Sequence, residues 1–171
     1  MRKALFFLGT LNDSDINWIA TRGVRQEVRA GRPLIQQGEP LTELFIVIDG
    51  TFAVTVGEPA RELARLHCGE ILGEISFVDS RPPSATVRAT ENSVVLAISR
   101  TLLQSKLQND QAFASRFYRA LSVFLADRLR TTNGAFSGSS NDSDQLDLET
   151  LDNLTLAGAR FDWLLTTLRG N

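Results

Sequence analysis

The sequence predicts a mainly β protein, a jelly-roll β-sandwich or barrel flanked by N-terminal and C-terminal α-helices. Between residues 24 and 99, short apolar runs alternate with turn residues at near-regular spacing. No long helical pattern separates these runs, as it would in a parallel α/β sheet. After residue 99 the apolar residues recur at helical spacing. Together these observations favour a closed antiparallel roll with helices at its ends.

A short helix is predicted before the first strand, over about residues 13–22. Asn12 offers a side-chain oxygen that can cap the first turn, and Ile16 and Ile19 recur at helical spacing. Residues 1–9 contain a brief apolar run that is too short for a secretory signal. We expect that segment to dock on the domain.

The strands are predicted from runs of branched and aromatic residues bounded by glycine, proline and other turn formers. The strongest hairpin signal is Asp49-Gly50, which stands between two apolar runs. The predicted strands are residues 24–28, 33–37, 44–49, 51–56, 61–66, 84–89 and 93–99.

Two helices are predicted after the strands, a brief one over 101–106 and a longer one over about 110–131. Phe113, Phe117, Leu121 and Arg128 lie on one side of the longer helix. Tyr118 and Val123 widen the apolar surface beyond a single stripe. The excess indicates a second covering layer or a homodimer formed through this helix.

The chain divides by composition into three parts: a domain over 1–132, a flexible polar linker over 133–145 and an apolar tail over 146–171. The tail is predicted to be helical at least over 156–168. A segment this apolar is not expected to remain unpacked in water. We expect it to dock on its own domain, on the long helix or on a protein partner.

Composition excludes several functions. The chain has 171 residues, 43% hydrophobic and 22% charged, with a formal net charge of −2. This balance argues against a general nucleic-acid surface, and the longest apolar runs are too short for a membrane span. One cysteine, Cys68, excludes an internal disulfide and suits the cytoplasm. One histidine, His67, cannot supply a metal centre or catalytic triad, so no enzyme, metal site or cofactor is expected.

Residues 72–87, here called the cassette, contain the most informative motif. Gly73 permits close approach of backbone N–H groups to an anion, and Glu74 adds an acceptor for a hydroxyl group. A Pro-Pro pair then precedes Ser84 and Ala85, which lead into a predicted strand. This combination suits a ligand with both a phosphate and a sugar hydroxyl.

The cassette resembles the phosphate-binding cassette of cyclic nucleotide-binding domains, of the catabolite activator protein and protein kinase A regulatory subunit type. The resemblance extends over about residues 4–131. It implies that Gly73 contacts the cyclic phosphate, that Glu74 accepts from the ribose 2′-hydroxyl, and that Ser84 and Ala85 follow the phosphate-binding arginine. Pro83 occupies that arginine's position, and the nearest guanidinium is Arg81.

Because a proline cannot replace a charge-assisted contact to phosphate, the resemblance leaves two functions open. The first is a non-enzymatic regulatory sensor or adaptor module that binds cyclic AMP, cyclic GMP or a related small phosphate ligand. It would signal through its C-terminal helices, with a hinge near residues 109–110. The second is a degenerate domain that binds a protein through its tail. No recognition helix for nucleic acid is expected in the tail. The expected ligand-binding residues are Gly73, Glu74, Ile75, Ser76, Arg81, Pro83, Ser84 and Ala85.

Overall fold

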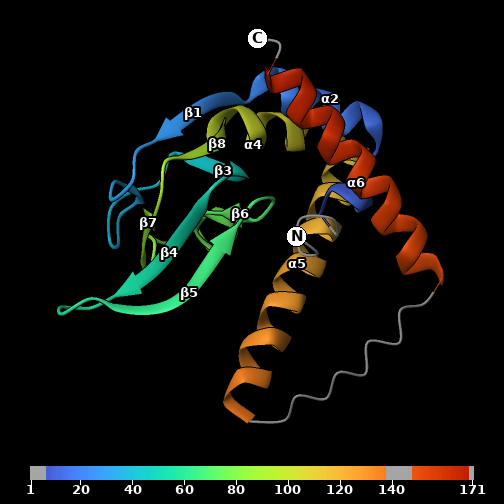
Figure 1. Cartoon of the computed structure of the whole chain (residues 1–171). Helices are drawn as coiled ribbons and strands as arrows, with labels where there is room; N and C mark the ends of the chain where they lie inside the picture. The colour runs from blue at the N-terminus through green and yellow to red at the C-terminus, as the bar shows by residue number, and fades with distance from the viewer. Residues whose placement is uncertain (1–6, 138–147, 170–171) are drawn as a thin grey trace.

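The computed structural model describes residues 7–137 and 148–169, in which eight strands form two four-stranded antiparallel sheets (Figure 1). The first sheet has the order β1-β8-β3-β6 and the second the order β2-β7-β4-β5. The predicted jelly-roll fold is confirmed. The strands are β1 (Val24–Val28), β2 (Pro33–Ile35), β3 (Glu43–Asp49), β4 (Thr51–Val56), β5 (Arg61–His67), β6 (Ile71–Leu72), β7 (Thr86–Ala89) and β8 (Ser93–Ser99).

Helices flank the roll at both ends of the chain, and one short helix lies between strands β6 and β7. A short helical segment over residues 7–10 precedes α2. None of the described helices is both long and apolar enough to cross a bilayer. The helices that follow are α2 (Asp13–Arg22), α3 (Glu74–Asp79), α4 (Arg100–Asn109), α5 (Gln111–Ser137) and α6 (Leu148–Arg169).

Some element boundaries differ from those expected. The strand expected over 33–37 ends at Ile35, because the Gln37 N–H donates to Thr86 Oγ1 instead of continuing the ladder. The strand expected from Ser84 begins at Thr86. Helix α5 continues past the expected domain boundary at 132, and residues 138–147 of the expected linker and tail lie outside the described part.

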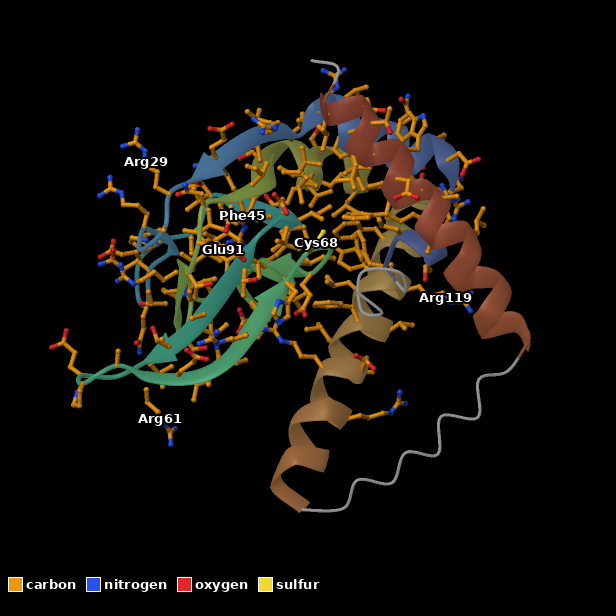
Figure 2. All side chains as sticks on the ribbon, in the orientation of Figure 1. Arg29, Phe45, Arg61, Cys68, Glu91 and Arg119 are labelled. Atoms are coloured by element: carbon orange, nitrogen blue, oxygen red, sulfur yellow. The ribbon has the colours of Figure 1, made fainter. Side chains whose placement is uncertain are left out.

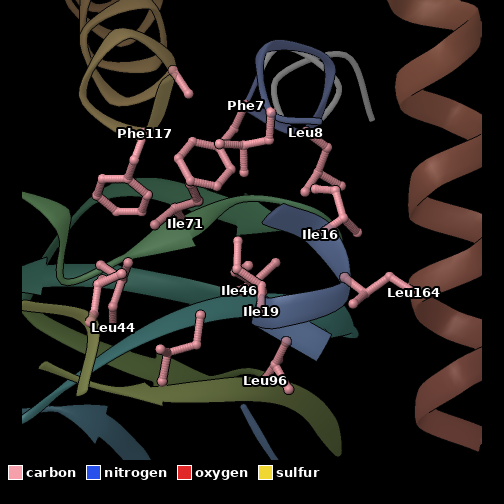
Figure 3. Packing of buried hydrophobic residues seen from close by; sticks show 14 of the residues in the cluster. Phe7, Leu8, Ile16, Ile19, Leu44, Ile46, Ile71, Leu96, Phe117 and Leu164 are labelled. Carbon is pink, nitrogen blue, oxygen red and sulfur yellow. The ribbon is translucent and has the colours of Figure 1, made fainter. Parts of the chain in front are cut away.

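Two apolar clusters lie on the two faces of the first sheet. Along β3, Leu44 and Ile46 belong to an outer cluster beneath the helices, whereas Phe45 and Val47 belong to an inner cluster between the sheets. Both faces of β3 are therefore buried, which explains why its sequence is continuously apolar. Figure 3 shows the outer cluster, to which the sheet, α2, α5 and α6 all contribute.

Charged side chains cover the solvent side of the roll. Figure 2 shows Arg29 and Arg61 projecting away from the strands, while Phe45 lies between them in the interior. Strand β5 is an edge strand whose first five residues are exposed, and its Arg65 Nε donates to Glu62 Oε1 at 2.8 Å. Charges on an edge strand discourage pairing with other chains.

Helix α2 is joined to α5 by a partly buried ion pair. Asp15 is 2% exposed and accepts from Arg116 Nε at 2.6 Å and from Arg116 Nη2 at 2.9 Å. The same carboxylate accepts from the Asn12 N–H at 3.0 Å and so completes the cap of α2. The start of α5 is thereby fixed against the N-terminal helix.

Candidate functional site

Gly73 begins the cassette in a conformation that favours glycine. Its φ is +85°, and a Cβ placed there would lie 2.6 Å from Leu41 Cδ2 and 3.3 Å from the Glu43 carbonyl oxygen. A side chain at this position would therefore meet both backbone strain and a steric clash. The backbone passes directly from β6 into the six-residue helix α3 at this point.

Glu74, the expected hydroxyl acceptor, is 2% exposed and forms an ion pair with Arg128 of α5. Burial raises the pKa of the Glu74 carboxyl, and the positive charge of Arg128 partly offsets this effect. The sequence indicated that Arg128 lies on the same side of its helix as the core residues. It gave no sign that Glu74 is the partner.

The remaining residues of α3 connect the cassette to the helices. Ser76 is buried, and its carbonyl oxygen accepts from Arg100 Nη2 at 2.8 Å, while Arg100 Nη1 donates to the Leu41 carbonyl oxygen at 2.9 Å. The next residue, Phe77, packs edge-on against Phe117 of α5 at 5.9 Å between ring centroids. Ile75 faces outward and is 52% exposed. Sequence reasoning missed Arg100, because its acceptors are backbone atoms.

The second half of the cassette is more exposed. The Arg81 N–H bonds to Asp79 Oδ1 at 3.0 Å, and among the described residues the Arg81 side chain has no hydrogen bond or ion pair. Pro83 is half-buried, and its carbonyl oxygen accepts from the Gly38 N–H at 2.9 Å. Ser84 is exposed, and Ala85 is half-buried against the inner cluster. The structure therefore places Arg81 on the surface near the proline.

The inner face of the second sheet becomes exposed beside the cassette. Val54 belongs to the inner cluster and pairs in register with Val87 on one side and Ala64 on the other. Directly paired residues share a face of the sheet, and so do residues two apart along one strand. Ala64 and Ala85 thus lie on the same face as Val54. Ala64 is exposed, so apolar surface remains open there.

The described side chains form no cluster of metal ligands near these residues. Among the side chains described, those of residues 7–130 and 156–168, no three His, Cys, Asp or Glu are grouped so as to hold a metal ion. Burial raises the pKa of the Cys68 thiol, whose Sγ donates to the Ile48 carbonyl oxygen at 2.9 Å. This environment disfavours a reactive thiolate.

Comparison with known families identifies the domain. Residues 25–110 match the family model described as the cyclic nucleotide-binding domain, which is half of the chain. The chain belongs to this family. Members of the cyclic nucleotide-binding domain family are generally regulatory rather than catalytic.

Three similar proteins illustrate the range of the family. The chain is 31% identical over 105 residues to a cGMP-dependent protein kinase of Toxoplasma gondii, covering 61% of this chain and 10% of the kinase. A cyclic nucleotide-binding domain from Methylobacillus flagellatus shares the fold with a TM-score of 0.71 at 18% identity, over 82% of this chain and 85% of that one. The regulatory subunit of a cAMP-independent protein kinase A from Trypanosoma brucei shares the fold with a TM-score of 0.61 at 18% identity, over 77% of this chain and 44% of that one.

The chain spans only about a tenth to a fifth of the length of the first curated relatives that it matches. The match to the family implies a cyclic nucleotide-binding regulatory module.

Proposed function

We propose that this protein is a non-enzymatic sensor module that binds a cyclic nucleotide, cyclic AMP or cyclic GMP, in the cassette and signals through its C-terminal helices. The family relationship supports the ligand class. The observation that carries the proposal is the buried pair between Glu74 and Arg128. The carboxylate expected to accept the ribose hydroxyl is also the group that holds α5.

The pair explains how an occupied cassette would act on α5. A ligand hydroxyl that donates to Glu74 would compete with Arg128 for the carboxylate oxygens. Ligand can shift α5 between two arrangements only by its differential affinity for them. Phe77 against Phe117 gives the cassette a second contact with the same helix, so movement of α3 is also transmitted there.

The phosphate side of the proposed site is weak. Gly73 is the expected phosphate contact, but Pro83, at the position of the expected arginine, supplies no guanidinium, and the Arg81 side chain is exposed. A hydrogen bond to a charged group contributes about 1.5–3 kcal/mol. The proposed affinity is therefore about ten- to a hundredfold lower than that of the same site with an arginine.

The substitution Pro83→Arg tests this function directly. Calorimetric titration with cyclic AMP and cyclic GMP is expected to show binding that tightens about ten- to a hundredfold in this variant. Arg81→Ala is the control, and it should leave affinity unchanged because that side chain is exposed. If Pro83→Arg binds neither nucleotide at millimolar concentration, the proposal is overturned.

A second candidate function rests on Pro83 and on the exposed Arg81. In this alternative the domain no longer binds nucleotide and recognises a protein through residues 146–171. Among residues 156–168 of α6, Leu156 and Trp163 are exposed apolar side chains that such a partner could contact. Two results together would favour this alternative: Trp163→Asp no longer binds a purified protein partner, and Pro83→Arg binds no nucleotide.

A further inference from the structure

A pocket of about 400 Å³ lies between α2 and α6, and no residue of the cassette lines it. Pockets that bind small molecules usually have volumes of about 300–1,000 Å³ and mostly apolar walls with a few polar groups. Its lining residues are Asp13 and Ile16 of α2, and Leu156, Ala159, Arg160 and Trp163 of α6.

The apolar side of the pocket is formed by large side chains that remain exposed. Leu156 is 45% exposed and Trp163 is 44% exposed, although both belong to a helix whose other face is buried. Positions seven apart lie on one face of a helix, so the two side chains border the same surface. Ile16, which is 1% exposed, contributes from the α2 side. The proposed nucleotide site uses none of these residues.

The polar side of the pocket is an ion pair with spare bonding capacity. Arg160 Nε donates to Asp13 Oδ1 at 2.8 Å, and Arg160 Nη1 donates to the carbonyl oxygens of Leu8 and Gly9 at 3.2 Å each. Within the described residues, Arg160 Nη2 and Asp13 Oδ2 take part in no hydrogen bond. A donor with positive charge and an acceptor with negative charge are thus available side by side.

We infer that this pocket binds a small apolar zwitterion, an α-amino acid with a branched or aromatic side chain. Its carboxylate accepts from Arg160 Nη2, its ammonium group donates to Asp13 Oδ2, and its side chain lies against Leu156 and Trp163. A ligand with a carboxylate alone would be repelled by Asp13, and one with an amine alone by Arg160. The ion pair therefore selects for a ligand that carries both charges.

The probe is L-leucine, compared with 4-methylpentanoate, which lacks the ammonium group, and 3-methylbutylamine, which lacks the carboxylate. The full chain contains two tryptophans and one tyrosine, so Trp18→Phe leaves Trp163 as the single tryptophan, which excitation at the red edge of the absorption band selects over Tyr118. We expect saturable quenching or a shift of Trp163 emission with L-leucine, and binding about fivefold weaker with either analogue. Equal responses to all three probes, or no saturable response to L-leucine, would overturn the inference.

Asp13→Asn provides the matched variant. Asp13 is 86% exposed, and asparagine keeps an oxygen that can accept from Arg160, so the substitution removes the charge with little effect on the fold. We expect L-leucine to bind this variant about fivefold more weakly, as weakly as 4-methylpentanoate. Asp162→Asn, on the exposed side of α6, should change nothing.

If Asp13→Asn keeps the full affinity for L-leucine, the inference is contradicted. It is also contradicted if an apolar helical peptide binds saturably and L-leucine does not bind. Neither outcome depends on the nucleotide titration, because the cassette shares no residue with this pocket.

Discussion

At the scale of single residues, Glu74 and Pro83 decide what the cassette can do. Glu74 is buried and paired with Arg128, so its charge is compensated from α5. Pro83 donates no hydrogen bond and carries no charge, so phosphate contacts in the proposed site would depend on backbone groups and Ser84. The two ends of the proposed ligand would therefore be recognised with unequal strength.

The raised pKa of Glu74 predicts a pH effect on stability. Because the pKa of this carboxyl is higher in the folded chain than in the unfolded chain, the folded state binds more protons between the two values. The contribution of Glu74 to the free energy of unfolding therefore falls as pH rises from about 4.3 through the raised pKa.

Glu74→Gln lacks this titration and serves as the reference. Denaturant unfolding between pH 4 and 7 should show that the wild-type chain loses stability relative to Glu74→Gln as pH increases. A difference that grows in the opposite direction would mean that Arg128 outweighs burial and lowers the pKa.

At the scale of elements, α5 has an anchored beginning and a more exposed continuation. Arg116 and Phe113 hold its first turns against α2 and the outer cluster. Beside its buried face, Tyr118 is 49% exposed, Leu125 is half-buried and Leu129 is 62% exposed. These positions recur at intervals of seven and four, which is the pattern of a seam between two packed helices. We propose that this stripe pairs with α5 of a second copy.

Leu129→Glu tests the proposed homodimer. A charge in the seam would be desolvated on pairing, so we expect the dissociation constant of the dimer to increase at least about tenfold. Val123→Glu is the matched control, because Val123 is 39% exposed but lies on the side of α5 opposite to the stripe. Sedimentation velocity over a concentration series measures both variants. Equal behaviour of the two variants would contradict pairing through this seam.

At the scale of the whole molecule, α6 completes the outer cluster from the far end of the chain. Ala157, Leu164 and Leu168 are buried with residues of α2 and the first sheet, and Figure 1 shows α6 lying against α2. Arg160 adds bonds to Asp13 and to the helical segment before α2. The described part of the tail is thus integrated with the N-terminal helices.

Leu164→Ala tests whether α6 contributes to stability. Leu164 is fully buried, so truncating it should lower the free energy of unfolding by about 2–5 kcal/mol. Leu156→Ala is the control, because that side chain is 45% exposed, and a change of no more than about 1 kcal/mol is expected. Thermal or urea unfolding provides the comparison. Similar small losses in both variants would indicate that α6 is undocked in solution.

Sequence patterns predicted elements well where local rules determine them. Asp49-Gly50 marked the β3–β4 hairpin, because few residues other than glycine adopt the φ of +89° found at Gly50. Asn12 marked the start of α2, because its side chain caps the Asp15 N–H. The two-residue strand β6 was missed, since it is too short to show a period. The role of Arg100 was missed because backbone carbonyl acceptors leave no trace in the sequence.

The sequence by itself determined the roll, the turns and the cassette, because strand period, turn chemistry and glycine requirements are local properties of the chain. Only the tertiary structure decided the partner of Glu74, 54 residues away, and the partner of Asp13, 147 residues away. Those pairings depend on how α5 and α6 pack over the outer cluster. Packing of apolar faces is non-directional, and a sequence that specifies an apolar helix does not specify the surface that buries it.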